Sequence, residues 1–308
     1  MSGLESDVAK ATLAVWVRPL GEGWAVANTP AGHRQLCRRL THCSVQRVVL
    51  EATGGYEQGV LAALTAAGWP VARINPLRAR GFAMACGQLA KTDPIDAAVL
   101  AHMAQTLELP PTAAPTPDQR QVRALVQRRE QRVQQRDDER RRLHQATLPL
   151  IRTSLQRCLR ALQRELRQIE TALTRAVGRA DPALAERLHA VAGIGPVTTA
   201  SLMAYLPELG TVDKRQIAAL VGAAPYNCDS GQHAGQRHIR GGRAALRRVL
   251  YMATWSVIRL QPEFKARYAR LRARGKCAKV ALIACMRVLI IRLNAMVRDG
   301  TPWKTWAG

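Results

Sequence analysis

Hydrophobic and polar positions follow two different periods in the first 110 residues. Apolar runs of strand length occur at Thr12–Val17, Val45–Leu50 and Pro70–Ile74. A helical pattern at Gln58–Ala67 separates the last two runs, and Gly68 ends it. Strands separated by about one helix length predict an α/β domain whose sheet has crossover connections. Ligand sites in such sheets gather at the carboxyl ends of the strands.

A proline-rich segment and a long helical repeat come next. The prolines of TLELPPTAAPTPD (106–118) indicate a domain boundary. From Leu148 to Leu173, apolar residues recur every three or four positions, which is typical of a coiled-coil seam. Because Pro149 suits only the first turn of a helix, we predict two long helical arms that meet near residues 147–149. Arg129, Arg136 and Arg140 on the first arm favour a subunit or a nucleic acid as partner, although a solvated bundle without a partner explains the same pattern.

A second globular region begins near Asp181. The stretch LHAVAGIGPVTTASLMAYL (188–206) predicts a helix, a Gly-Ile-Gly turn and a second helix. Gly193 and Gly195 let backbone amides approach a phosphate at a helix N-terminus, as in a helix-hairpin-helix element, but a tight turn accounts for them equally. The predicted organisation is an α/β domain over 1–110, a linker and coiled-coil arms over 111–180, and a mainly helical domain over 181–308.

Composition indicates a folded protein with an anionic partner. The chain has 47% apolar residues, and its 46 Lys and Arg against 22 Asp and Glu leave a formal charge of +24. Such an excess attracts nucleic acid. An anionic membrane is the competing partner, but arginines interrupt the apolar runs before the roughly 20 residues that a span needs. The opening residues MSGLESDVAK lack the pattern of a signal peptide, so we expect a cytoplasmic, bacterial protein with no membrane partner.

Cysteine and aromatic residues exclude two classes of site. The seven cysteines form no CxxC pair, which argues against a zinc knuckle and a complete disulfide framework and predicts free thiols in the core. Two Phe and five Tyr are few for a single-strand binder built on stacking platforms.

Four carboxylates in the first domain are candidate metal ligands. Asp7 is expected to open the first strand, and Glu51 closes another before a Gly-Gly turn. Asp93 and Asp96 lie three residues apart at a helix start, where Asp93 as N-cap, with Pro94 in the first turn, explains the motif without any function. If the four converge, Mg²⁺ is the ion that offsets their repulsion, and oxygen-ligated magnesium is typical of phosphoryl transfer.

One hydroxyl in the segment APYNCDSGQ (224–232) is a candidate nucleophile. Ser230 needs a base, a metal or nearby cations to attack, and none of Asp229, His233 and His238 is a convincing base. An ordinary turn at 229–231 is the alternative. Guanidinium groups that suit the charge on phosphate oxygens follow in the chain, at Arg237, Arg240, Arg243, Arg247 and Arg248.

Several of these motifs together resemble one known family. The stretches DVAKATL (7–13), VVLEATGGYE (48–57), LAKTDPIDAAVLA (89–101), GIGPVT (193–198), QIAALVGAAPYNCDSG (216–231) and IRGGRAALRRVLYMA (239–253) are similar to the IS110 insertion-sequence family of transposases and recombinases. The resemblance implies a RuvC-like, ribonuclease-H-type fold for the N-terminal domain. It also implies a DEDD set in which Asp7, Glu51, Asp93 and Asp96 hold magnesium.

The resemblance further implies a mechanism and partners. Ser230 would attack a DNA phosphate and form a covalent phosphoserine. Similar proteins are guided by a structured non-coding bridge RNA, join donor and target double-stranded DNA, and act as dimers that assemble into tetramers. The arm pair 118–177 matches their dimerisation region. Two other functions stay open: a metal-dependent junction-type nuclease in which water attacks, and a non-catalytic nucleic-acid-binding scaffold.

Overall fold

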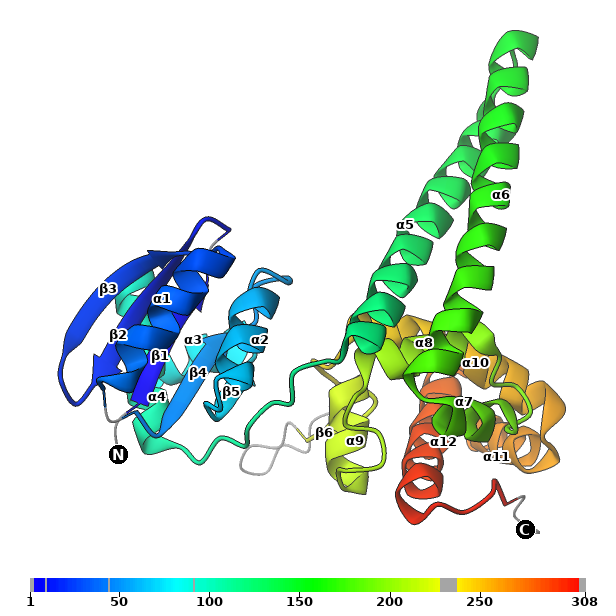
Figure 1. Cartoon of the computed structure of the whole chain (residues 1–308). Coiled ribbons are helices and arrows are strands. Elements are labelled where there is room, and N and C mark those ends of the chain that lie inside the picture. The colour runs from blue at the N-terminus through cyan, green and yellow to red at the C-terminus, as the bar shows by residue number, and fades with distance from the viewer. Residues whose placement is uncertain (1–2, 9, 44, 91, 228–236, 305–308) are drawn as a thin grey trace. The chain divides into compact units, whose positions relative to one another are not determined.

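The chain folds into two compact units, residues 1–115 and 116–308 (Figure 1). The computed structural model describes the backbone of residues 3–8 and all atoms of 10–43, 45–90, 92–227 and 237–304. The division into three functional domains stays a prediction.

A five-stranded sheet of order β3-β2-β1-β4-β5 forms the centre of the first unit. The antiparallel strands are β1 (Gly3–Val8), β2 (Thr12–Arg18) and β3 (Glu22–Ala27). β4 (Arg47–Glu51) and β5 (Val71–Ile74) run parallel to β1. The three strands predicted from apolar runs are confirmed as β2, β4 and β5, whereas β1 and β3 were missed.

Helices pack against both faces of this sheet. In β4, Val48 and Leu50 join one core cluster with α1 (Pro30–Thr41) and α2 (Gln58–Ala66). The alternate residue Val49 joins another cluster, with α3 (Pro76–Ala85) and α4 (Asp93–Thr106). Since both faces are covered, β4 is apolar at successive positions. This apolar run is why the sequence predicts a strand there. The predicted helix at 58–67 is confirmed to within one residue.

One residue of the proline-rich segment, Thr112, is hydrogen-bonded to the sheet. Thr112 donates its backbone N–H to the Val71 carbonyl (2.7 Å), and its hydroxyl accepts from the backbone N–H of Arg73 (2.9 Å). Thr112 therefore occupies two hydrogen-bonding groups at the outer edge of β5.

Two long antiparallel helices, α5 (Pro117–Gln145) and α6 (Pro149–Ala180), form the predicted arms (Figure 1). Arg129 donates to Glu170 (2.8 Å), and Arg132 pairs with Glu165 (2.6 Å). Arg129 therefore has a partner inside the arm pair, and an external partner for Arg129, Arg136 and Arg140 stays a prediction. A coiled coil and a role in dimerisation stay predictions.

The rest of the second unit surrounds one large core cluster to which α7 to α12 contribute. Its elements are α7 (Pro182–His189), α8 (Pro196–Tyr205), α9 (Lys214–Val221), β6 (Pro225–Tyr226), β7 (His238–Ile239), α10 (Ala244–Leu260), α11 (Pro262–Ala273) and α12 (Ala278–Asp299).

Among the described helices, α12 is long and apolar enough to cross a membrane by length and composition alone, with a mean hydropathy of 2.0. Half of this apolar window is buried inside the fold. Leu282, Leu289 and Leu293 are fully buried in the core cluster. The apolar character of α12 is therefore that of a core helix.

The described cysteines are free, as predicted, but half of them are exposed. Of the six that the structure describes, Cys285 is buried, whereas Cys86, Cys158 and Cys277 are exposed. Cys86 and Cys277 cap helix ends, where the chain reaches the surface. The core placement of these exposed thiols was wrong, and Cys228 lies outside the described residues.

The N-cap residues of α5 and α4, both threonines, give a matched test of capping. The Thr116 hydroxyl accepts from the Gln119 N–H (3.2 Å), and the Gln119 side chain accepts from the Thr116 N–H (2.9 Å). Thr92 caps α4 without a side-chain hydrogen bond. Thr116→Ala is expected to lower the free energy of unfolding by ~1 kcal/mol, and Thr92→Ala by much less, as measured by urea denaturation. Equal losses would contradict the assignment of the capping box.

Candidate active site

The ends of β1 and β4 bring two predicted carboxylate positions together. The parallel register pairs Gly3 with Arg47 and continues to Ser6 with Leu50, so the next residues along the two strands are Asp7 and Glu51. Both lie at the carboxyl ends of neighbouring strands, where α/β sheets place ligands. Asp7 is the penultimate residue of β1. The prediction that it opens the first strand is corrected, since the strand that starts at Thr12 is β2.

The first turn of α4 is directed to the same end of the sheet. Arg47, at the start of β4, donates to the carbonyl of Leu107, which caps the end of α4 (2.9 Å). Val49 and Leu100 share a core cluster. α4 therefore lies antiparallel to β4. Its 14 residues span ~21 Å, against ~16 Å for β4, which is long enough to bring its start to the level of Glu51.

The described carboxylates differ in exposure. Glu51 lies two residues after Val49, so strand alternation places it on the sheet face that α4 covers. Glu51 and Asp96 are half-buried, and Asp93 is exposed. Asp93 is the first residue of α4, and the N-cap is Thr92. The alternative that made Asp93 the cap is therefore wrong.

The donor chemistry of this end of the sheet fits magnesium. Its predicted ligands are all carboxylates, the hard oxygen donors that Mg²⁺ prefers. The backbone brings the elements that carry all four to one end of the sheet. Across the residues searched, which exclude the side chain of Asp7, no three His, Cys, Asp or Glu side chains are grouped to hold a metal ion.

The turn that follows Glu51 contains a buried carboxylate that sequence reasoning missed. Glu57 is only 2% exposed. Its Oε2 accepts from the N–H groups of Thr53 (3.2 Å) and Gly55 (2.8 Å), and its Oε1 accepts from Arg73 Nη1 (3.4 Å). The pattern Gly-Gly-Tyr-Glu directly after a strand was the available indication.

Ser230 lies within 228–236, outside the described residues. The chain on either side of this segment is held together. β6 pairs with β7, and Arg243 donates its backbone N–H to the Leu220 carbonyl (2.8 Å). Gly222 and Gly242 both have positive φ, and a Cβ on Gly242 would lie 2.2 Å from the Gly222 nitrogen. This close approach requires glycine at position 242.

Two of the five predicted phosphate-binding arginines have partners within the protein. Arg243 donates to both carboxylate oxygens of Glu208 (2.6 and 2.5 Å) and to the Tyr205 carbonyl (2.7 Å). Arg247 donates to the Gly241 carbonyl (2.6 Å). The other three arginines are exposed: Arg237, Arg240 and Arg248. Contact between any of the five arginines and a phosphate stays a prediction.

The Gly-Ile-Gly turn has a partial structural explanation. Gly193 has φ +100°, and a Cβ there would lie 2.7 Å from the backbone nitrogen of Val257, so packing on α10 requires glycine. Gly195 caps α8 with φ −93° and has open space around it. A helix-hairpin-helix role for the two glycines stays a prediction.

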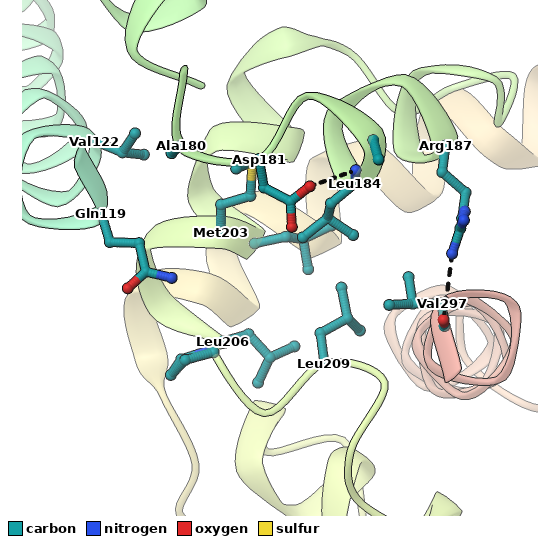
Figure 2. A pocket seen from close by; sticks show the side chains of 13 residues that line it. Gln119, Val122, Ala180, Asp181, Leu184, Arg187, Met203, Leu206, Leu209 and Val297 are labelled. Carbon is teal, nitrogen blue, oxygen red and sulfur yellow. Dashed lines mark hydrogen bonds between the residues drawn. The ribbon is translucent and has the colours of Figure 1, made fainter. Parts of the chain in front are cut away.

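A cavity of about 280 Å³ lies where α5 begins and α6 meets α7 (Figure 2). Leu184, Met203 and Leu206 are among the apolar residues that line it. Its polar groups have partners: Asp181 accepts from the Leu184 N–H (2.9 Å), and Arg187 donates to the Val297 carbonyl (3.4 Å; Figure 2). None of the predicted site residues lines this cavity.

Comparison with known proteins identifies the family. The chain matches the family DEDD_Tnp_IS110, described as a transposase, over residues 7–152, and the Transposase IS116/IS110/IS902 family over residues 185–269. The chain belongs to the IS110 family of transposases. The two matched ranges of this IS110-family protein include all five predicted catalytic residues.

Curated relatives of the IS110-family chain are bacterial. It is 32% identical over 162 residues to the "Insertion element IS110 uncharacterized 43.6 kDa protein" of Streptomyces coelicolor, an alignment that covers 52% of this chain and about two fifths (39%) of that protein. It is 26% identical to the "Pilin gene-inverting protein" of Moraxella lacunata and to that of Moraxella bovis, with 84% of this chain and 82% of each relative covered. The Thermus thermophilus RuvC structure matches 37% of this chain and 85% of its own, at 18% identity and a TM-score of 0.25.

Proposed function

We propose that this IS110-family chain is a DNA recombinase that cuts and rejoins strands through a covalent phosphoserine at Ser230, with magnesium held by Asp7, Glu51, Asp93 and Asp96. The observation that carries the proposal is that β1 and β4 end side by side and that α4 starts toward the same end of the sheet. Membership of a transposase family supports DNA as the substrate.

The proposed step exchanges one phosphate ester bond for another, so the number of these bonds does not change. The Ser230 oxygen bonds to phosphorus, the bond from phosphorus to the leaving sugar oxygen breaks, and that oxygen takes a proton to become a free hydroxyl. The reverse attack by a sugar hydroxyl restores the strand and frees the serine, so no external energy source is needed. Bound magnesium would supply positive charge for the phosphate oxygens.

The residues of the chain have separate tasks in this proposal. The carboxylates hold and orient the metal ion. The exposed Arg237, Arg240 and Arg248 stabilise the charge that grows on phosphate oxygens. Arg243 and Arg247 keep the chain at the base of the serine segment in place through Glu208 and the Gly241 carbonyl.

The proposed partners follow from charge and from the family. A formal charge of +24 favours binding to both donor and target duplexes and to a structured guide RNA. The Moraxella relatives are named for gene inversion, which requires two DNA sites to be cut and rejoined. We also propose that the protein forms a dimer that assembles into a tetramer. In this assembly, the carboxylates of one subunit would act on the DNA together with Ser230 of another subunit.

A covalent adduct assay tests the nucleophile. Full-length protein is incubated with labelled element-end DNA, guide RNA and Mg²⁺, and the products are separated under denaturing conditions. Wild-type protein is expected to give a protein–DNA adduct and rejoined DNA, and Ser230→Ala to give neither. Ser154→Ala, which removes an exposed hydroxyl on α6, is the matched control and should behave as wild type.

The same assay separates the rival functions. Equal adduct from wild type and Ser230→Ala would show that another residue attacks. A junction-type nuclease would give cut DNA with no adduct and no rejoining. A binding scaffold would give neither product, and Glu51→Ala would leave its biological activity unchanged.

A further inference from the structure

The turn between β4 and α2, residues 52–56, directly follows the candidate ligand Glu51. Gly54 (φ +73°) and Gly55 (φ +120°) adopt backbone conformations that favour glycine, and no atom lies within 4 Å of the position of an added Cβ at either residue. The Tyr56 side chain is 50% exposed. The turn therefore presents open backbone and an aromatic ring beside the acidic end of the sheet.

Three neighbouring elements hold this exposed turn in place. Glu57, the N-cap of α2, accepts two of the turn's N–H groups, and Arg73 of β5 pairs with Glu57. On the other side, Asn28 Nδ2 donates to the Tyr56 carbonyl (3.1 Å), and Asn28 Oδ1 lies 2.7 Å from the Nε2 of the buried His33. Because an amide oxygen can only accept, the Nε2–H of His33 donates this hydrogen bond, and burial lowers the pKa of His33.

One polar atom of the turn has no partner. The Thr53 hydroxyl is buried and makes no hydrogen bond within the described part of the chain. An unsatisfied buried hydroxyl costs stability, about 1–3 kcal/mol in general. Because this hydroxyl is shielded from solvent, its missing hydrogen bond is a local cost to the turn and not a group that a ligand reaches directly.

We propose that the turn 52–56 binds the DNA strand that is cut. The open backbone at Gly54 and Gly55 lets the sugar–phosphate backbone approach, and the exposed Tyr56 ring packs against a sugar or base of that strand. Glu57, Arg73, Asn28 and His33 are positioning residues. The inference rests on the proposed function, because that function makes a DNA strand the substrate of the acidic site.

Photocrosslinking tests the contact without requiring catalysis. A benzophenone amino acid replaces Tyr56 in the full-length protein, and element-end DNA and guide RNA carry different labels. The matched control places it at Leu20, which is 58% exposed in the turn beside Arg18, at the opposite end of β1 from Asp7. We expect a DNA crosslink from position 56 that exceeds that from position 20 by at least about tenfold. Equal yields, no crosslink, or a crosslink to RNA alone would overturn the proposal.

Glu57→Gln tests the positioning role. It is expected to lower the DNA crosslink from position 56 several-fold and to lower the melting temperature, because a buried carboxylate that pairs with Arg73 is lost, while overall DNA affinity stays unchanged. Glu22→Gln, at an exposed carboxylate of β3, should change none of these. An unchanged crosslink in correctly folded Glu57→Gln would contradict this role. Repeating the crosslink in Glu51→Gln separates the two proposals: a retained DNA contact with unimpaired cleavage would refute the acidic site and leave the binding turn standing.

Discussion

Glu51→Gln is expected to slow DNA strand cleavage by about a thousandfold while the protein stays folded. The amide keeps the size of the half-buried side chain but removes the negative charge with which Glu51 would hold magnesium. Metal stabilisation of charge in phosphoryl transfer is worth several kcal/mol, and ~4 kcal/mol corresponds to ~10³ in rate. The initial cleavage rate on labelled element-end DNA at saturating Mg²⁺ measures the effect, and circular dichroism checks the fold.

Two comparisons make this result specific to the acidic site. Glu108→Gln removes an exposed carboxylate of the same unit and should leave the rate unchanged. Chelation of Mg²⁺ should slow the wild type to the rate of Glu51→Gln and slow the variant little further, because both changes remove the same interaction. A variant that keeps most of its activity, or that loses a further thousandfold on chelation, would contradict a metal-binding role for Glu51.

Gly242→Ala is expected to lower the free energy of unfolding by ~3 kcal/mol, and Gly241→Ala by only ~1 kcal/mol. The two glycines have nearly the same positive φ, +71° and +69°. A Cβ at Gly242 would meet the backbone of Gly222 at 2.2 and 2.4 Å, whereas nothing lies within 4 Å at Gly241. The backbone strain is common to both variants, so their difference measures the close approach alone.

Urea denaturation followed by circular dichroism measures this difference. Because Gly222 and Gly242 lie on either side of the Ser230 segment, covalent adduct formation should also fall further in Gly242→Ala than in Gly241→Ala. Equal destabilisation by the two substitutions would show that the loops at 222 and 242 do not touch.

Elements with strong local patterns were predictable, and elements defined by their neighbours were not. β4 is a continuous apolar run at 48–50 because it is buried on both faces, and β5 is apolar except at Arg73. β1, with the sequence GLESDV, has no such run, and its strand structure depends on backbone pairing with β2 and β4 on either side. β3 begins with Glu22 and Gly23, which do not form an apolar run. Glycine at position 23 is explained only by the neighbouring strand, because an added Cβ there would lie 2.5 Å from the Trp16 ring of β2.

The candidate site shows the same division. The position of Glu51 follows from the rule that a residue after a buried parallel strand lies at the ligand-binding edge. The role of Glu57 in holding the turn depends on Arg73, which lies sixteen residues later in the chain, on β5. The partner of Arg243 lies on the loop after α8, so sequence alone could indicate only its charge. Tertiary pairing, which has no local sequence signature, determines which arginines remain available to a ligand.

The pairing of Thr112 with β5 affects how copies of this chain can associate. An open edge strand exposes unpaired N–H and C=O groups to any other extended chain. Thr112 occupies the Val71 carbonyl and the Arg73 N–H. This border of the sheet is therefore closed to strand addition at these positions, which protects it against aggregation and excludes them as a route for the sheets of two subunits to merge.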